Sequence, residues 1–295
     1  MTSTPIADTH TARQAWVNGE LLGAGDVPQV SILDRGYLLG DSIFETLRVR
    51  DGHEVGWALH FELLARAARA FGLDLRYSAA ALGVAAREVA TRIGHPDVTI
   101  RVTLSRGVGG QGVSPRGCVE PMLTLLARPT TPYPAAAYVS GIDSHVLETR
   151  RIPSACLDAR FKTGCYLPAV MAKTELDRLG TVEGLMLTID GRLASGAVSN
   201  VFFVRDGVLC TPSLSCDCRE GVTRSLVLAA AARERLAVEE VELRLEDLTS
   251  TTEMFFTNTL MECLPVRSLG SRHFGPPGPV TRALLAALRA PRGAS

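Results

Sequence analysis

The sequence contains very little lysine. Of its 31 basic residues only Lys162 and Lys173 are lysine, and the others are arginine. Arginine keeps its proton at working pH, whereas a desolvated lysine can lose its proton and become a nucleophilic amine. Lys173 lies on the polar side of a predicted helix, and we expect it to be solvated. Lys162 lies between Phe161 and an apolar run and is the candidate reactive group, although a lysine that extends from a strand end into solvent would give the same pattern.

A net charge and a long apolar run are also missing. The 31 acidic residues balance the 31 basic ones, so no overall field would attract nucleic acid or an anionic membrane. The longest apolar stretches, such as 226–232, are far shorter than the ~20 residues that cross a bilayer. Residues 1–12 are polar and lack the apolar core of a signal segment. We therefore expect a disordered tail, a cytoplasmic protein and a small-molecule ligand, with no nucleic-acid or membrane partner.

Metal-ligand spacing is absent as well. The seven cysteines are scattered through the chain, and in a protein that is not exported they are expected to be free thiols. Cys216 and Cys218 form a C-x-C pair, but no second pair of cysteines or histidines stands at ligand spacing. We predict no metal site. Cys165, near Lys162, is interpreted as a core residue, with a pocket thiol as the alternative.

Length and composition indicate two α+β domains. The 295 residues exceed one ordinary domain. Three prolines in 129–134 (PTTPYP) make this segment the best candidate for a stiff linker. We predict a small N-terminal α/β domain at 13–128, a linker at 129–136, and a larger C-terminal domain at 137–295 that carries Lys162.

Periodicity locates the elements within each half. Apolar residues at helical spacing predict helices, and alternation or short apolar runs between turn residues predict strands. The predicted helices are 59–73, 79–93, 167–179, 223–236 and 279–289. The predicted strands are a hairpin over 15–22 with Asn18-Gly19 as its turn, then 43–50, 98–106, 121–127, 137–148, 184–189, 198–204, 208–210 and 254–257. A glycine-rich loop is predicted at 107–117.

Six motifs follow one another in a fixed order. They are 30–41 (VSILDRGYLLGD), 44–48 (FETLR), Phe161-Lys162-Thr163 with Tyr166-Leu167, 199–202 (SNVF), 221–224 (GVTR), and Thr257-Asn258-Thr259 before Pro265-Val266. Over about residues 15–290 they resemble the class IV aminotransferases. This pyridoxal-phosphate family includes branched-chain and D-amino-acid transaminases and 4-amino-4-deoxychorismate lyase. The loop at 105–112 resembles the lyase branch, although the family often has arginine where Gln111 stands.

The resemblance implies a fold, a homodimer and a set of residue roles. The fold is the two-domain α+β fold-type IV, with a small N-terminal α/β domain and a larger domain on a barrel-like sheet. Lys162 matches the lysine that forms the internal aldimine. The other positions that the resemblance assigns to the site are Val222, Thr223 and Thr259 at the phosphate, Ser195, Asn200, Arg219 and Asn258 elsewhere in the cofactor pocket, and Phe44, Arg106, Gln111 and Tyr166 toward the substrate.

Three positions depart from the family pattern. Ser195 stands five residues before Asn200, where the family has a glutamate that keeps the pyridine nitrogen protonated. Leu63 stands where an H-x-x-R-L motif has a phosphate-binding arginine, although Arg66, one turn later, could reach back. Arg219 replaces a leucine that packs on the cofactor ring. We predict that pyridoxal phosphate has been lost or binds weakly.

Several polar residues have a structural interpretation beside the functional one. We expect His60 to be a packing residue at a helix start and Glu45 to be structural rather than a pocket acid. Tyr166 and Asn200 are expected to support Lys162 and its strand. Arg106 could equally bind a substrate carboxylate or staple its own loop.

Three functions stay open. In the first, a repurposed, cofactor-independent enzyme uses Lys162 as a base or nucleophile on a small anionic substrate. Burial and cations such as Arg219 would lower the pKa of this lysine from about 10.4. The second is a pyridoxal-phosphate lyase or transaminase with Lys162 as the aldimine lysine. The third is a non-catalytic binding protein. We favour the first, because three cofactor contacts have changed while Lys162 persists.

Overall fold

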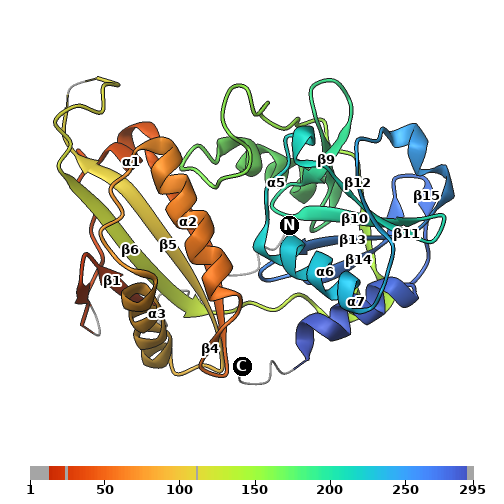
Figure 1. The fold of residues 1–295 in the computed structure, drawn as a ribbon, viewed down its shortest axis with the longest axis horizontal. Coiled ribbons are helices and arrows are strands. Elements are labelled where there is room, and N and C mark those ends of the chain that lie inside the picture. Colours follow the sequence, from red (N-terminus) through yellow and green to blue (C-terminus); the bar gives the residue numbers. More distant parts are fainter. Residues whose placement is uncertain (1–12, 24–25, 111, 291–295) are drawn as a thin grey trace, which may run out of the picture. The chain divides into compact units, whose positions relative to one another are not determined.

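The computed structural model describes residues 13–23, 26–110 and 112–290, which divide into two compact units (Figure 1). Unit 1 holds the described residues up to Thr131 together with Lys162–Cys165, and unit 2 holds Pro132–Phe161 and the described residues from Tyr166 onward. The chain passes from unit 1 to unit 2 within the segment predicted as a linker. The N-terminal tail predicted at 1–12 lies outside the described residues.

Unit 1 is a six-stranded sheet with two helices packed against it (Figure 1). The strand order is β2-β1-β6-β5-β3-β4. Asn18 and Gly19, with φ of 46° and 105°, form the predicted turn of the β1–β2 hairpin, which requires positive φ at both positions. The elements are β1 (Gln14–Val17), β2 (Glu20–Leu21), α1 (Arg35–Leu39), β3 (Ser42–Arg50), β4 (His53–Glu54), α2 (Trp57–Phe71), α3 (Ala79–Ile93), β5 (Asp97–Val108) and β6 (Glu120–Pro129).

Strand β3 has one face toward α2 and one face away from it. Glu45 on β3 lies 2.9 Å from the His60 ring on α2, so its side chain points toward the helix. Because successive side chains of a strand point to opposite faces, Phe44 lies on the other face, where it is also buried.

Strand β5 continues two residues into the glycine-rich loop that was predicted to begin at 107. Gly107 has a φ of 81°, and a Cβ there would lie 1.7 Å from the carbonyl oxygen of Glu120. The pairing of β5 with β6 shifts register between Ser105 and Val108. Only glycine fits this bulge, and the bulge allows the ladder to continue.

Unit 2 is built on a seven-stranded sheet. Its order is β12-β11-β10-β13-β14-β15, and β7 pairs with β14 in parallel. A separate hairpin joins β8 and β9. The elements are α4 (Ala135–Ser140), β7 (Ile142–Ser144), α5 (Leu167–Leu179), β8 (Leu185–Leu187), β9 (Leu193–Gly196), β10 (Asn200–Arg205), β11 (Val208–Pro212), η1 (Leu214–Cys216), α6 (Val222–Arg233), β12 (Val238–Val241), η2 (Leu245–Ser250), β13 (Thr251–Asn258), β14 (Glu262–Leu269), β15 (Arg272–His273) and α7 (Pro279–Arg289).

The central strands of this sheet are buried on both faces. Phe202 on β10 stacks on Phe255 of β13, with ring centroids 5.2 Å apart, and this face packs against α6 and α7. Phe203 and Phe256 point the other way, into a cluster with residues of β8, β9 and β14. A strand covered on both faces needs a continuous apolar run, which explains why 198–204 and 254–257 were recognisable as strands.

One predicted strand is largely wrong. The segment 137–148 was predicted as a strand, but Ala135–Ser140 forms the helix α4 and only Ile142–Ser144 forms a strand. Three alanines after Pro134 favour a helix start, and Gly141, with a φ of 74°, ends it. None of the helices in the described part of the chain is long and apolar enough to cross a membrane.

Candidate active site

Lys162 is held at the edge of the unit 1 sheet. Its carbonyl oxygen accepts a hydrogen bond from the N–H of Phe44 at 3.0 Å, and the N–H of Gly164 donates to the carbonyl of Ser42 at 2.7 Å. The segment therefore adds a short antiparallel stretch to the start of β3. Lys162 was predicted to belong to the second domain, but this backbone pairing places Lys162–Cys165 in unit 1.

The side chain of Lys162 lies against an aromatic ring. Residues that face each other in an antiparallel pair project from the same face, and Nζ of Lys162 lies 5.5 Å from the ring centroid of Phe44. The guanidinium of Arg101 stacks on the same ring at 3.5 Å. A cation is attracted to the face of an aromatic ring. Phe44, predicted to contact the substrate, thus orients the amine and shares its ring with a second cation.

Arg106 makes three hydrogen bonds within unit 1. Its Nε donates to Asp41 at 2.8 Å, and its two Nη atoms donate to the carbonyls of Gly72 and Phe71 at the end of α2, at 2.6 and 2.8 Å. Asp41 also accepts from Arg35 at 2.9 Å. Burial alone would raise the pKa of Asp41, but the hydrogen bonds and charges of the two arginines outweigh it and lower the pKa. These contacts hold β5 to Asp41 and to the end of α2, as expected of a structural residue. The substrate role of Arg106 stays a prediction.

The structure also gives the surroundings of the other unit 1 residues that the sequence analysis singled out. Leu63 is buried on α2. His60 Nδ1 and the Glu45 carboxylate form a buried pair at 2.9 Å, which fits the structural roles expected of both. Cys165 was interpreted as a core residue, and this was wrong. It is exposed, because it lies at the end of a segment that pairs only along the sheet edge. Gln111 lies outside the described residues.

In unit 2, the side chain of Asn200 joins the start of β10 to the start of α6. Its amide donates to the carbonyl of Arg219 at 2.7 Å, and its Oδ1 would lie 2.2 Å from a Cβ on Gly221. Gly221 is the N-cap of α6 and has no side chain to cap it. A helix start of this kind favours an anion. The predicted residues Asn200, Arg219, Val222 and Thr223 therefore come together.

The end of β13 lies next to Asn200, at the start of β10. Thr257 lies directly opposite Asn200 in the sheet. Its hydroxyl is buried and has no hydrogen-bond partner among the residues that the structure describes. Asn258 accepts from two N–H groups of the following turn and donates to the carbonyl of Val198 at 3.2 Å. Asn258 thus holds the turn that contains the predicted Thr259.

Ser195 is buried within β9. Its hydroxyl donates to the carbonyl of the neighbouring Gly196 at 2.9 Å. The side chain is therefore neutral, and its proton is used in a hydrogen bond to the next residue.

Lys173, expected to be solvated, is half-buried on α5, and its amine donates to the carbonyl of Val182.

Sequence reasoning missed a fully buried acid, Glu183. Its carboxylate accepts from the N–H groups of Gly184 and Ala197 at 3.1 and 2.8 Å and from the Ser199 hydroxyl at 3.1 Å. Burial raises the pKa of Glu183, and Lys173 and the hydrogen bonds counteract only part of that effect. Glu183 organises the loop that leads into β10. The sequence offered one signal for Glu183: an acidic residue close before the apolar run 185–187, which indicates that it enters the core with the strand.

A second residue that the sequence reasoning missed is Arg151. Its Nε donates to the carbonyl of Asp217 at 3.1 Å. Burial is the largest influence on the pKa of Arg151 and lowers it; Tyr166, Cys218 and the charge of Asp217 raise the pKa, and the charge of Arg219 lowers it further. Two predicted site residues, Tyr166 and Arg219, are thus close enough to act on the charge of Arg151. The adjacent pair Arg150-Arg151 was visible in the sequence but does not by itself indicate a site.

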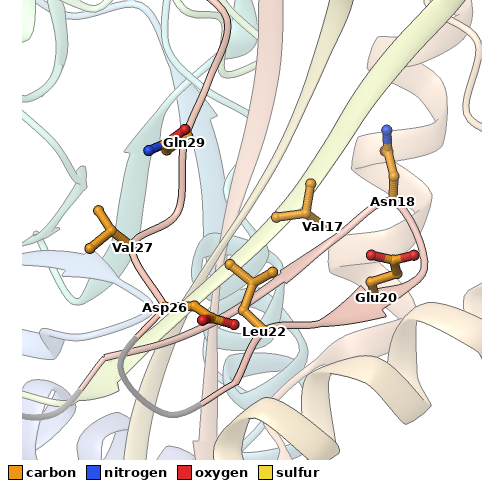
Figure 2. Close-up of a pocket in the computed structure, with 7 residues that line it drawn as sticks. All are labelled: Val17, Asn18, Glu20, Leu22, Asp26, Val27 and Gln29. Carbon is orange, nitrogen blue, oxygen red and sulfur yellow. The ribbon is translucent and has the colours of Figure 1, made fainter.

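Unit 1 also has an open hollow of about 550 Å³ beside the β1–β2 hairpin (Figure 2). It is lined by Val17, Asn18, Glu20, Leu22, Asp26, Val27 and Gln29. None of the predicted site residues lines this hollow. Within the described part of the chain, no group of three or more His, Cys, Asp or Glu side chains could hold a metal ion, and the seven cysteines are free thiols.

Comparisons with known proteins agree with the motif pattern. The model of the amino-transferase class IV family matches residues 42–269. The chain is 30% identical over 282 residues to the branched-chain-amino-acid aminotransferase of Escherichia coli, covering 93% of this chain and 91% of that protein. It is 28% identical over 270 residues to the aminodeoxychorismate lyase of Bacillus subtilis, covering 88% of each.

Solved structures show the same relationship. The crystal structure of the E. coli branched-chain aminotransferase has a TM-score of 0.88 at 29% identity and covers 93% of both chains. The branched-chain aminotransferase of the thermophilic archaeon Thermoproteus uzoniensis, solved with norvaline, has a TM-score of 0.86 at 28% identity, covering 94% of this chain and 93% of that one. The predicted fold-type IV architecture is confirmed, and the chain belongs to the class IV aminotransferase family.

Proposed function

We propose that this chain is a diverged class IV enzyme, lyase- or transferase-like, that acts on a small anionic substrate through Lys162 without pyridoxal phosphate. One observation carries the proposal: the position expected to protonate the cofactor ring is Ser195, a buried hydroxyl that donates to its own neighbour. A hydroxyl there cannot supply the negative charge that keeps a pyridine nitrogen protonated.

Two further residues argue in the same direction. Leu63 is an apolar residue of the α2 core, where a bidentate arginine would hold the phosphate. Arg219 is a cation where an apolar surface would support the ring. The residues present therefore do not fit the ring of pyridoxal phosphate, and we derive no step through it.

The alternative, a pyridoxal-phosphate lyase or transaminase, has specific support at the phosphate end. The uncapped start of α6 and the buried hydroxyl of Thr257 offer donors to an anion, and a helix start is a common phosphate site. The same donors serve any oxyanion, so they agree with both functions. The fit to the ring, rather than the phosphate, distinguishes the two.

Lys162 is suited to act as a base or a nucleophile. Its backbone is fixed by pairing with β3, and the Phe44 ring orients its amine, so little conformational freedom is lost when a substrate binds. The neutral amine can accept a proton from an acidic C–H or O–H, or attack a carbonyl carbon. A homodimer and a cytoplasmic location are parts of the same proposal.

Because the chain has only two lysines, one experiment tests the proposal directly. The purified protein is incubated with pyridoxal phosphate and reduced with borohydride, and the adducts on Lys162 and Lys173 are quantified by peptide mass analysis. We expect a colourless native protein and no preference for Lys162 over Lys173, since the hydroxyl of Ser195 supplies no negative charge to the ring nitrogen.

The variant Lys162→Arg serves as the control for the absorbance measurement, because it keeps the charge and removes the reactive amine. A native protein with a visible aldimine band, abolished by borohydride and joined to Lys162, would establish the alternative instead.

A further inference from the structure

A small cavity lies at one end of the unit 1 sheet, and none of the predicted site residues lines it. Its volume is about 170 Å³, and its walls come from β5, β6, the β1–β2 turn and the connection 74–77 between α2 and α3. Leu104 and Leu123, which pair across β5 and β6 and are almost completely buried, form its apolar end together with Pro121. An engineered cavity of about 150 Å³ holds a benzene ring, so a side chain of a few carbons fits here.

The rim of the cavity carries an acid and a base side by side. Nε of Arg76 donates to Oδ2 of Asp74 at 2.7 Å, and Nη2 of Arg76 donates to the carbonyl of Val119. Within the part of the chain that the structure describes, Oδ1 of Asp74 and Nη1 of Arg76 have no hydrogen-bond partner. One negative acceptor and one positive donor are therefore available on neighbouring side chains.

Another pair with the same Asp-x-Arg spacing lacks these available groups. Asp190 and Arg192 in unit 2 make the same contact between Nε and Oδ2, at 2.9 Å. There Oδ1 of Asp190 accepts from the hydroxyl of Thr188, and Nη1 of Arg192 donates to Glu242 at 2.8 Å. The pair in unit 2 is thus saturated by its own neighbours, whereas each partner of the pair at the cavity keeps one group for a ligand.

Tyr77 adds a neutral polar group to the same cavity. Its ring meets the ring of Trp16 edge to face, with centroids 5.1 Å apart, and its hydroxyl would lie 3.6 Å from a Cβ on Gly19. The side chain is half-buried, yet its hydroxyl has no hydrogen-bond partner among the described residues. A phenol in such a place usually has a partner, and a ligand in the cavity would supply one.

We propose that this cavity binds a small zwitterion, namely a free α-amino acid with a compact apolar side chain such as leucine. Its ammonium group would pair with Asp74 and its carboxylate with Arg76; these two charges are attached to one carbon, which suits two neighbouring groups on the rim. A simple cation is repelled by Arg76 and a simple anion by Asp74. The inference does not depend on the proposed function, because it uses no residue of the candidate active site.

Trp16 gives a local readout, because its ring contacts Tyr77. The chain has two tryptophans, so Trp57→Phe leaves Trp16 as the only one. Leucine is titrated into this protein and followed by fluorescence and by calorimetry. Both rim charges are exposed and are screened by solvent, so we expect a dissociation constant of about 1 mM. Leucinamide, 4-methylpentanoate and glycine, which lack the carboxylate, the ammonium and the side chain respectively, should each bind at least fivefold more weakly.

Variants in the same background locate the site. Asp74→Asn and Arg76→Gln should each weaken leucine binding at least fivefold. Because both residues are exposed, their melting temperatures should stay within about 4 °C of the parent protein, which separates lost binding from unfolding. Asp190→Asn is the matched control, since it changes an acid of the saturated pair, and its affinity for leucine should equal that of the parent.

Lys162→Arg distinguishes the cavity from the candidate active site, because leucine should still change the fluorescence of Trp16 in this variant. The assignment is overturned if leucine gives no saturable signal by either method or if the analogues with one charge bind as tightly as leucine. Unchanged binding in both Asp74→Asn and Arg76→Gln, or loss of the signal in Lys162→Arg, would overturn it as well. A cofactor on Lys162 would contradict the proposed function and leave leucine binding at the cavity intact.

Discussion

Glu183 has no exposed surface, and its raised pKa gives stability a definite pH dependence. An acid whose pKa is raised on folding stabilises the native state below its unfolded pKa, and that stability is lost as the pH rises through the folded pKa. Each pKa unit corresponds to about 1.4 kcal/mol. Glu183→Gln, which is neutral throughout, should therefore gain melting temperature relative to the unmodified protein between pH 4 and pH 8.

The control for this prediction has the opposite sign. Glu175 is half-buried, but the N–H groups of Glu148 and Thr149 and the Thr149 hydroxyl outweigh burial and lower its pKa. It stabilises the fold above its unfolded pKa, so Glu175→Gln should lose melting temperature relative to the unmodified protein as the pH rises. Parallel curves for both variants would contradict the opposite pKa shifts of the two acids.

At this scale the sequence could indicate Lys162 but not Arg151 or Glu183. Lys162 was detectable because lysine is rare in this chain, which is a property of the sequence. What distinguishes Arg151 is its contact with Asp217, and what distinguishes Glu183 is complete burial. Both are properties of the folded chain, since they depend on residues such as Asp217 and Ala197 that lie far away in the sequence.

Among the elements, Arg106 links the bulged strand β5 to the C-terminal end of α2. Arg106→Gln removes a charge-assisted bond to Asp41 and two donors from the carbonyls of Phe71 and Gly72. Hydrogen bonds of charged groups contribute about 1.5–3 kcal/mol each before solvent screening, so we expect the free energy of unfolding to fall by about 2 kcal/mol in chemical denaturation.

Arg76→Gln is the matched control, because Arg76 is exposed and its bonds to Asp74 and to the carbonyl of Val119 are exposed too; exposed pairs contribute about 0–1 kcal/mol. If Arg106→Gln keeps full stability and instead weakens substrate binding, the structural role of Arg106 is wrong and its role in binding the substrate is supported.

Element boundaries were predicted best where a capping residue next to the element marks its start or its end. The helices α3, α5 and α7 begin and end as predicted, because Ser78 caps α3 and Gly94 and Gly180 end α3 and α5. The helix α4 was missed, because six residues are too few to show a helical period. Strand β14 was missed, because Pro265 interrupts its pattern although it pairs with Phe255.

For the whole molecule, the division into two units followed from length and the proline-rich segment. The place of Lys162 did not follow. Its segment pairs with β3 over a separation of more than a hundred residues, and three residues at a sheet edge show no periodic signal. The backbone hydrogen bonds of the folded chain are what place it in unit 1.

The proposed homodimer is also a property of the whole molecule, and unit 1 offers a surface for it. The segment that contains α1 exposes Ile32, Leu33 and Tyr37 at 73, 59 and 72%, and several exposed apolar side chains within one short segment make it a candidate interaction site. We expect the double variant Ile32→Glu/Tyr37→Glu to convert a dimer into a monomer in light scattering after size exclusion. Ile189→Glu, at an equally exposed residue (71%) in unit 2, should stay dimeric. A monomeric unmodified protein, or a double variant that still dimerises, would exclude this segment as the interface, because two buried carboxylates without partners cannot be accommodated in an apolar contact.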